Sequence, residues 1–158
     1  MHNIISRVPI SFYKDHKYFR HIVEILSNHP GEDALLALHA AVLTHGSTIL
    51  SVGMNKPKSN GLVRAYAPHD RMTIHAEVDC ILKARKKHDL TGTTIYVGRK
   101  LKRHDLFSMS KPCATCHAIM KQYGVRHVFY TNEFGSIEYF DTRKEYIKDP
   151  LWHVLKEV

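Results

Sequence analysis

Two short motifs, far apart in the chain, most constrain how it can fold. The first is His-Ala-Glu at positions 75–77, and the second is Pro-Cys-Ala-Thr-Cys at positions 112–116. Two cysteines three positions apart at a helix start project from one face, and a histidine from a second helix can complete a three-ligand zinc site. The fold must therefore bring the starts of two helices together, and the fourth zinc position stays open for water.

The residue types in the two motifs suit a hydrolytic reaction. Zinc brings the ionisation of a bound water close to neutral pH, so that the resulting hydroxide can attack an amidine-like carbon. If His75 and Glu77 lie on one helix, two residues apart, their side chains point about 200° away from each other. We therefore interpret Glu77 as a proton carrier and not as a ligand. A helix start at Pro112 would lower the pKa of both following thiols.

Each motif alone has a simpler explanation. A Cys-x-x-Cys pair is often half of a structural zinc site or a redox pair, and His-x-Glu is common by chance. A structural zinc site would need a fourth protein ligand. The remaining cysteine, Cys80, follows His75 in the same apolar helix on another face, and we interpret it as a core thiol. The two motifs in this order favour a catalytic site.

The composition agrees with an intracellular enzyme. The 158 residues are 44% hydrophobic and 24% charged, which predicts one domain over residues 1–158 with a buried core. We find no export signal at the start and no apolar run of membrane length, and therefore expect a cytoplasmic protein without membrane contact. Cysteines that must stay reduced also indicate a reducing compartment.

Apolar periodicity predicts alternating helices and strands. In the first half we expect a helix over 15–29, a hairpin of 34–44 and 48–52, a polar loop to residue 71, and a helix that carries the first motif with Ile74, Val78, Ile81 and Leu82 on its apolar face. In the second half we expect a strand over 93–97, a helix over 113–123 ended by Gly124, and a strand over 126–131. A hairpin turn at 132–135 should lead into a strand with Ile137, Tyr139 and Phe140, followed by a short helix from Asp149.

With these motifs in this order, the chain resembles the cytidine and deoxycytidylate deaminase superfamily over about residues 34–140. The resemblance implies an α/β fold, a three-layer α/β/α sandwich with a five-stranded mixed sheet of the cytidine deaminase type. It implies Zn²⁺ as the cofactor, with His75, Cys113 and Cys116 as the zinc ligands. It also implies Glu77 as the residue that shuttles protons.

The resemblance extends to residues around the substrate. Gly-x-Asn-x-Pro at positions 53–57 is similar to the family's substrate loop, in which the asparagine, here Asn55, contacts the sugar or the base. Ala76 is similar to the residue whose backbone N–H holds the base carbonyl. Ser110, two residues before the proline of the second motif, is closer to the cytosine-directed branches. We therefore expect these three residues to bind substrate.

Several branches of the superfamily remain open. Free-cytidine deaminases usually carry cysteine where this chain has His75, and deaminases of tRNA adenosine or guanine usually carry glutamate where it has Lys111. The expected antiparallel last strand also differs from deoxycytidylate deaminases, which usually insert a helix before a parallel strand.

The charge indicates an anionic partner. The net charge is +8 and the pI is near 9.4, and positive potential steers phosphates. Basic residues gather in the two predicted loops that lead into the motifs, namely Lys56, Lys58, Arg64 and Arg71 before the histidine and Arg99, Lys100, Lys102, Arg103 and Lys111 before the cysteines. The simpler explanation is that these loops are merely solvated.

We thus predict a zinc-dependent hydrolytic deaminase that converts cytosine to uracil in a phosphorylated substrate, most like a deoxycytidylate deaminase, and we expect a homo-oligomer. One alternative is a polynucleotide deaminase acting on a base in single-stranded DNA or RNA, tRNA adenosine included. Another is a non-catalytic nucleic-acid-binding relative, against which Glu77 argues. We interpret five further histidines as surface or core residues, namely His39, His45, His69, His104 and His127, with His69 and His104 in the loops at the pocket rim.

Overall fold

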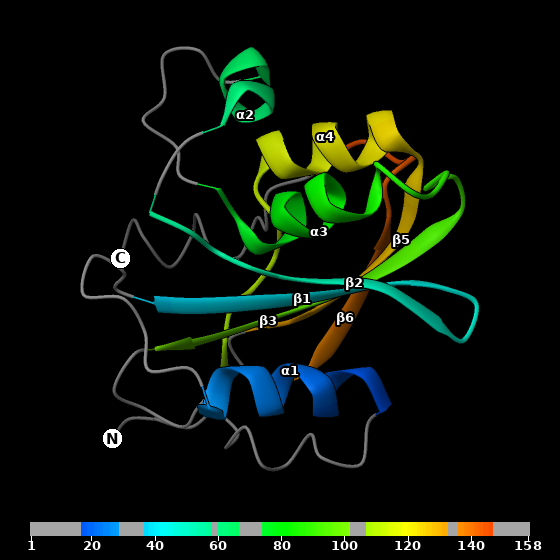
Figure 1. The fold of residues 1–158 in the computed structure, drawn as a ribbon. Helices are drawn as coiled ribbons and strands as arrows, with labels where there is room; N and C mark the ends of the chain where they lie inside the picture. The colour runs from blue at the N-terminus through cyan, green and yellow to red at the C-terminus, as the bar shows by residue number, and fades with distance from the viewer. Residues whose placement is uncertain are drawn as a thin grey trace.

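A mixed β-sheet lies between two layers of helices in the computed structural model, which describes residues 17–28, 37–57, 60–66, 74–101, 107–132 and 136–146. One face of the sheet is covered by α1 (Lys17–Asn28), as Figure 1 shows. The other face carries α3 (Ala76–Ala84) and α4 (Ala114–Tyr123), with the short α2 (Gly61–Tyr66) beyond them. This arrangement is the predicted three-layer α/β/α sandwich.

The main path of the sheet has five strands in the order β2-β1-β3-β5-β6. The strands are β1 (Ala37–His45), β2 (Thr48–Met54), β3 (Thr93–Leu101), β5 (Val125–Thr131) and β6 (Ile137–Asp141). Strands β3 and β5 pair in parallel and the other neighbours pair antiparallel. The predicted five-stranded mixed sheet is therefore confirmed, and a two-residue strand, β4 (Phe107–Ser108), pairs beside it with β3.

Strand β1 shows how the sequence distributes side chains between the two faces. Leu38, Ala40 and Val42 pack with the helix α1, whereas Ala41 and Leu43 belong to the core under α3 and α4. Successive residues of a strand point to opposite faces, so the odd-numbered positions of β1 face the motif-bearing helices.

The helix α1 follows from its apolar periodicity. Phe19, Ile22 and Leu26 recur at helical spacing and are fully buried against the sheet. This is the face predicted from the sequence. The expected cap at Asp15 and the helix end near residue 29 lie outside the described residues.

The connection from β3 through α4 to β5 places the second motif. Because β3 and β5 are parallel, the helix between them must cross over one face of the sheet, and its start then lies near the end of β3. Gly124 ends α4 with a φ of 85°, as predicted, and a Cβ there would lie 2.8 Å from Cα of Thr91. This crossover sets α4 beside α3 (Figure 1).

Three features were not predicted. The polar segment after β2 contains α2, the segment after β3 contains β4, and β3 continues to Leu101 instead of ending at position 97. These elements carry many polar side chains, so the apolar pattern used to predict elements did not show them. At the end of a strand, successive side chains still point to opposite faces of the sheet even when they are polar. Arg99 and Lys100 are consequently strand residues with opposite orientations and not loop residues.

The antiparallel last strand is confirmed. β5 and β6 pair antiparallel from His127 with Asp141 to Thr131 with Ile137, and the N–H of Asn132 donates to the carbonyl of Ser136 at 2.9 Å. The turn residues 133–135 and the short helix expected from Asp149 lie outside the described residues. No helix within the described ranges has the length and apolar character needed to cross a membrane.

Gly53 should not tolerate a side chain. A Cβ there would lie 2.5 Å from the carbonyl oxygen of Ala76 and 2.7 Å from the backbone nitrogen of Cys80. We expect Gly53→Ala to lower the free energy of unfolding by roughly 1–3 kcal/mol, because β2 and α3 must separate to relieve the overlap. Chemical denaturation measures this effect. Gly61→Ala is the matched control, since the nearest atom there is 3.9 Å away, and equal stability of the two variants would contradict the expectation.

Candidate active site

The two motifs meet where α3 and α4 begin. The ligand atoms of His75, Cys113 and Cys116 all lie within 4.8 Å of one another. Nδ1 of His75 is 3.2 Å from Sγ of Cys116 and 3.8 Å from Sγ of Cys113. One imidazole and two thiolates are a set of donors that zinc prefers, and three protein ligands leave a fourth position open. The residues brought together therefore fit a zinc ion.

Both motifs supply the residue just before a helix. His75 is the N-cap of α3 and Cys113 is the N-cap of α4, each with extended backbone dihedrals. Neither side chain caps its own helix, although N-cap side chains usually do so. Both are thus directed at the shared site. Pro112 precedes the N-cap, so its predicted position in the first helical turn was wrong.

The two thiols share a hydrogen bond and titrate in opposite directions. A hydrogen bond with Cys116, supported by His75, lowers the pKa of Cys113 to about 4. The same contact, together with burial, raises the pKa of Cys116 well above its ordinary value. The expected lowering therefore holds for Cys113 alone, because a thiol pair in contact keeps one proton between its two sulfurs.

Glu77 lies beside the three-residue group in a buried position. Its side chain is 2% exposed, and Oε1 has no hydrogen-bond partner within the described residues. Burial raises the pKa of Glu77, against the opposing effects of His75 and of a hydrogen bond with Cys116. The predicted helical angle from His75 does not apply, since His75 precedes the helix in an extended conformation. This geometry brings the carboxyl close to the site instead of turning it away.

The loop after β2 is fastened to its surroundings by hydrogen bonds. Oδ1 of Asn55 accepts the N–H of His39 at 2.9 Å, and the N–H of Asn55 donates to the carbonyl of His39 at 3.3 Å. The next residue, Lys56, donates its N–H to the carbonyl of Ile74 at 2.9 Å. Asn55 is therefore held between β1 and the residue that precedes His75.

Asp79 on α3 anchors the same loop. It accepts hydrogen bonds from the N–H of Met54 at 3.0 Å and from the ammonium groups of Lys56 at 3.0 Å and Lys83 at 2.9 Å. Burial alone would raise the pKa of Asp79, but these donors together lower it. The sequence alone could not predict this role of Asp79, because the residues that donate to its carboxylate are up to 25 positions away along the chain.

Asp79→Asn should loosen the loop and weaken the fold. We expect a loss of roughly 1–2 kcal/mol in the free energy of unfolding, since both lysines are partly exposed. The lowered pKa means that the carboxylate stabilises the fold above its ordinary pKa and that this contribution disappears as the pH falls through the folded pKa. Denaturation at neutral and acidic pH measures the difference.

The matched control is Asp89→Asn, an exposed aspartate that hydrogen-bonds Thr91. A pH-independent loss in the Asp79 variant, or an equal loss in the control, would contradict the anchoring role.

The other two expected substrate residues are buried. Ala76 is fully buried in the first turn of α3. The hydroxyl of Ser110 donates to the carbonyl of Val97 at 2.9 Å and accepts the N–H of Thr131 at 2.8 Å. Ser110 thus links β3 and β5 just before the cysteine motif, and its contact with substrate stays a prediction.

His39 is a site neighbour that the sequence interpretation missed. Its ring stacks beside that of His75, with the centroids 6.5 Å apart and the planes 29° apart. Burial, followed by the charges of Arg99 and His75, lowers the pKa of His39 to about 3. The alternation of β1 could have indicated this position, because His39 shares a face with Ala41 and Leu43. His45 and His127 are partly or fully exposed as expected, and His69 and His104 lie outside the described residues.

Cys80 is a core thiol, as predicted. It is fully buried, its Sγ lies 3.2 Å from the carbonyl oxygen of Ala41, and burial strongly raises its pKa. A protonated sulfur in an apolar cluster is unsuited to hold a metal ion.

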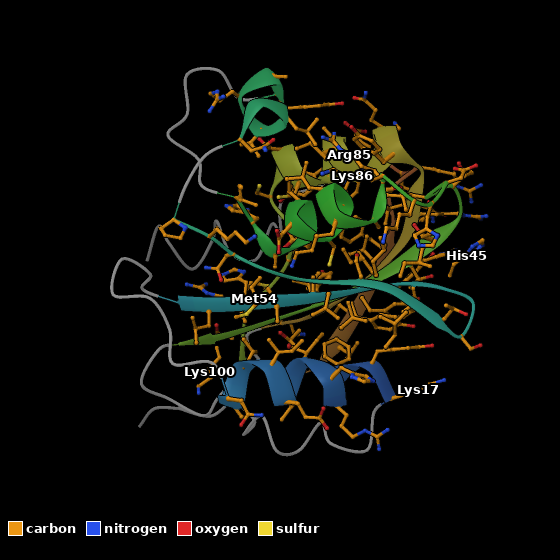
Figure 2. All side chains as sticks on the ribbon, in the orientation of Figure 1. Lys17, His45, Met54, Arg85, Lys86 and Lys100 are labelled. Atoms are coloured by element: carbon orange, nitrogen blue, oxygen red, sulfur yellow. The ribbon has the colours of Figure 1, made fainter. Side chains whose placement is uncertain are left out.

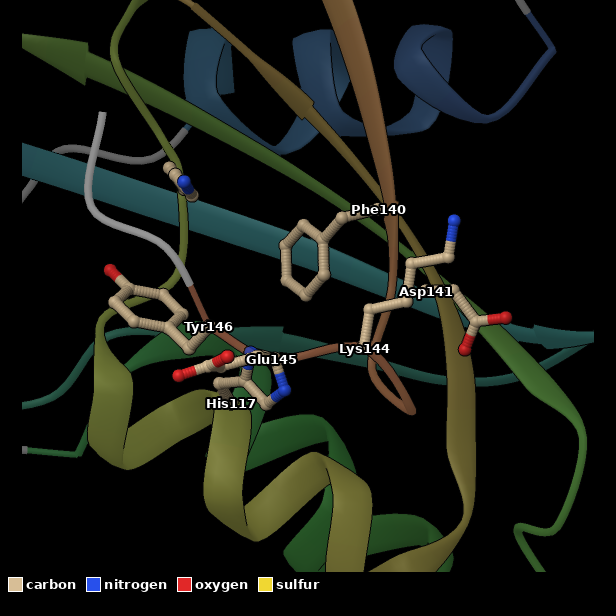
Figure 3. A pocket seen from close by; sticks show the side chains of 7 residues that line it. His117, Phe140, Asp141, Lys144, Glu145 and Tyr146 are labelled. Atoms are coloured by element: carbon tan, nitrogen blue, oxygen red, sulfur yellow. The ribbon is translucent and has the colours of Figure 1, made fainter. Parts of the chain in front are cut away.

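A cavity of about 190 Å³ adjoins α4 on the side of β6 (Figure 3). Its wall includes the ring of His117, which stacks on Phe140 at 5.3 Å and meets Tyr146 edge-on at 5.4 Å. Nε2 of His117 lies 2.9 Å from the carbonyl oxygen of Thr142, so this nitrogen carries the proton and donates it. Lys111, two residues before Cys113, also lines the cavity, which therefore lies close to the cysteine motif. Burial, followed by the charge of Cys113, raises the pKa of Tyr146.

The predicted basic loops are only partly described. Lys56 is paired with Asp79, and Lys100 is buried on the α1 side of the sheet, where its ammonium donates to the carbonyl of Leu26 at 3.5 Å (Figure 2). Lys58, Arg71, Lys102 and Arg103 lie outside the described residues. Two described residues of the second set remain: Arg99 lies on the face of the sheet that carries the site, and the ammonium of Lys111 lies 5.2 Å from the centroid of the Tyr146 ring.

Comparison with known proteins identifies the class. The family described as the cytidine and deoxycytidylate deaminase zinc-binding region matches residues 13–132. This match covers most of the chain, so the protein belongs to that family. It is a zinc-dependent hydrolytic deaminase, as predicted from the two motifs.

One solved structure shows the same fold. A cytidine deaminase from Burkholderia pseudomallei is similar with a TM-score of 0.56 and 16% identity, over 81% of this chain and 92% of that one. A dCMP deaminase from the cyanophage S-TIM5 in apo form is similar with a TM-score of 0.48 and 20% identity, over 73% of this chain and 80% of that one. No curated protein sequence matches the chain.

Proposed function

We propose that this deaminase converts cytosine to uracil in a phosphorylated mononucleotide, most like a deoxycytidylate deaminase. The observation that carries the proposal is the convergence of His75, Cys113 and Cys116 beside the buried carboxyl of Glu77. The reaction consumes one water and releases one ammonia, so it needs a polarised water and a group that moves protons between oxygen and nitrogen.

The chain's own residues divide these tasks. His75, Cys113 and Cys116 would hold zinc, which when bound lowers the pKa of water and stabilises developing negative charge. Glu77 would accept the proton of the attacking water, pass it to the ring nitrogen of cytosine and then assist the departure of the amino group as ammonia. Its buried environment favours the protonated form, which suits a carboxyl that must donate as well as accept.

The substrate contacts are proposed from the same neighbourhood. We propose that the side-chain amide of Asn55 contacts the sugar or the base, because its hydrogen bonds with His39 hold the residue beside the site. The backbone N–H of Ala76 would meet the base carbonyl, since Ala76 begins α3 directly after His75. Ser110 would act at the pocket wall, where it ties β3 to β5.

A mononucleotide is favoured over a polynucleotide by the placement of charge. In the second basic set, Lys100 is buried on the α1 side of the sheet, away from the site, and so cannot contribute to holding a polynucleotide there. Arg99, by contrast, lies on the face of the site and can serve a single phosphate.

A substrate panel tests this proposal. Zinc-loaded protein is incubated with deoxycytidine, dCMP, CMP and a cytosine-containing oligonucleotide, and ammonia release is measured at several salt concentrations. We expect turnover of a mononucleotide with a shallow dependence on salt, because one phosphate releases few counterions. Turnover of the oligonucleotide alone, with a steep salt dependence, would instead favour the polynucleotide deaminase.

We further propose that residues 1–158 act as one domain in the cytoplasm and that the protein is a homo-oligomer. The need for reduced thiols at Cys113 and Cys116 supports the compartment. Light scattering on purified protein tests the assembly, and a mass equal to one chain at working concentration would contradict it.

A further inference from the structure

The imidazole ring of His39 faces the site and makes no hydrogen bond within the described residues. The residue is half-buried. Its backbone is fully engaged with Asn55, which fixes the strand at this point. A polar group that is partly desolvated and unpaired in the protein is available to a ligand.

Arg99 continues the same face of the sheet. It is the direct antiparallel partner of His39, on the neighbouring strand β3, where opposite side chains are about 5 Å apart at Cβ. Ile95 and Val97 on this strand pack into the core under α3 and α4, so alternation places Arg99 on their side. Burial is the main cause of the lowered pKa of His39, and the charge of Arg99 on the neighbouring strand adds to it.

The order along this face is therefore His75, His39 and Arg99. The first belongs to the group that would hold zinc, the second offers a hydrogen-bonding ring, and the third offers a guanidinium. A nucleotide has its parts in a matching order, because the sugar joins the base to the phosphate. Guanidinium groups bind phosphate oxygens through two parallel N–H donors.

We propose that His39 and Arg99 form the nucleotide-specific end of the substrate pocket, with His39 facing the sugar and Arg99 binding the phosphate. This proposal rests on the proposed function and adds the residues that would select a nucleotide over a nucleoside. Neither side chain belongs to the three-residue group that would hold zinc, so we expect variants at both positions to fold and to keep zinc.

Steady-state kinetics on dCMP and deoxycytidine with zinc-loaded variants tests the proposal. Arg99→Gln should lower kcat/KM for dCMP by about 10- to 100-fold, mainly through KM, because a charged hydrogen-bond partner is lost. It should leave deoxycytidine unchanged. His39→Phe keeps a ring of similar shape and should lower kcat/KM for both substrates by about 2- to 10-fold, since both carry the sugar.

Lys100→Gln is the matched control. This variant removes the next positive charge along β3, which lies on the opposite face of the sheet. It should therefore leave kcat/KM unchanged for both dCMP and deoxycytidine. Zinc content and melting temperature, measured for each variant, should stay at the wild-type values in the His39 and Arg99 variants. An Arg99→Gln variant that affects dCMP and deoxycytidine equally, or affects neither, would overturn the proposal.

Calorimetric binding separates this proposal from the proposed function. If the wild-type protein turned over no mononucleotide, the proposed function would fail, while the binding of dUMP and deoxyuridine would still judge the pocket. We expect dUMP to bind more tightly than deoxyuridine and to lose that advantage in Arg99→Gln. Equal binding of the two ligands by the wild-type protein would contradict the inference.

Discussion

Glu77→Gln should lower the rate of deamination by roughly 10²- to 10⁴-fold, the range that general acid–base catalysis supplies. The amide has nearly the same shape as the carboxyl but cannot carry a proton between water and the ring nitrogen. The variant should remain folded, because Oε1 of Glu77 makes no hydrogen bond within the described residues. Ammonia release under saturating substrate measures the loss.

Zinc content distinguishes this role from coordination. Glu77→Gln should keep about one zinc per chain, since the three residues that converge are His75, Cys113 and Cys116. Loss of zinc from the variant, with activity restored by added metal, would show that Glu77 holds the ion and does not move protons.

Cys113→Ala should abolish both zinc binding and turnover. Two ligands remain in this variant, too few for a stable site, and a site that forms only in the folded chain also lends its binding energy to folding. We therefore expect a lower melting temperature and a fall in activity to background. Metal analysis after dialysis and differential scanning calorimetry measure the two effects.

Cys80→Ala is the control for this experiment. This variant removes a sulfur that is fully buried in the core and does not belong to the three-residue metal group. We expect it to keep its zinc and its activity but to have a lower free energy of unfolding. Full activity in a zinc-free Cys113→Ala preparation would disprove the assignment of the site.

The candidate zinc ligands could be predicted from the sequence because they are recognised by residue type and by short spacings within each motif. Cys113 and Cys116 lie within one helical turn, and Glu77 is two residues after His75, so each half of the site is local. The apolar runs on both sides also predicted α1, the first hairpin and the end of α4 at Gly124. These elements depend on neighbouring residues alone.

The surroundings of the site could not be predicted because they depend on strand pairing. His39 and Arg99 are opposite each other only through the β1–β3 register, and Asp79 meets Met54 only when α3 packs on β2. The orientation of Arg99 and Lys100 to opposite faces required knowing that β3 reaches Leu101. The position of Glu77 likewise required knowing that His75 precedes its helix.

Isotope transfer from solvent tests the central claim most directly. Zinc-loaded protein is incubated with dCMP in water enriched in oxygen-18, and the product is analysed by mass spectrometry together with ammonia. We predict dUMP that carries the heavy oxygen at the ring carbon that lost its amino group, with one ammonia released per product. Unlabelled dUMP, or no dUMP from a preparation with a full complement of zinc, would contradict hydrolytic deamination of a cytosine nucleotide at this site.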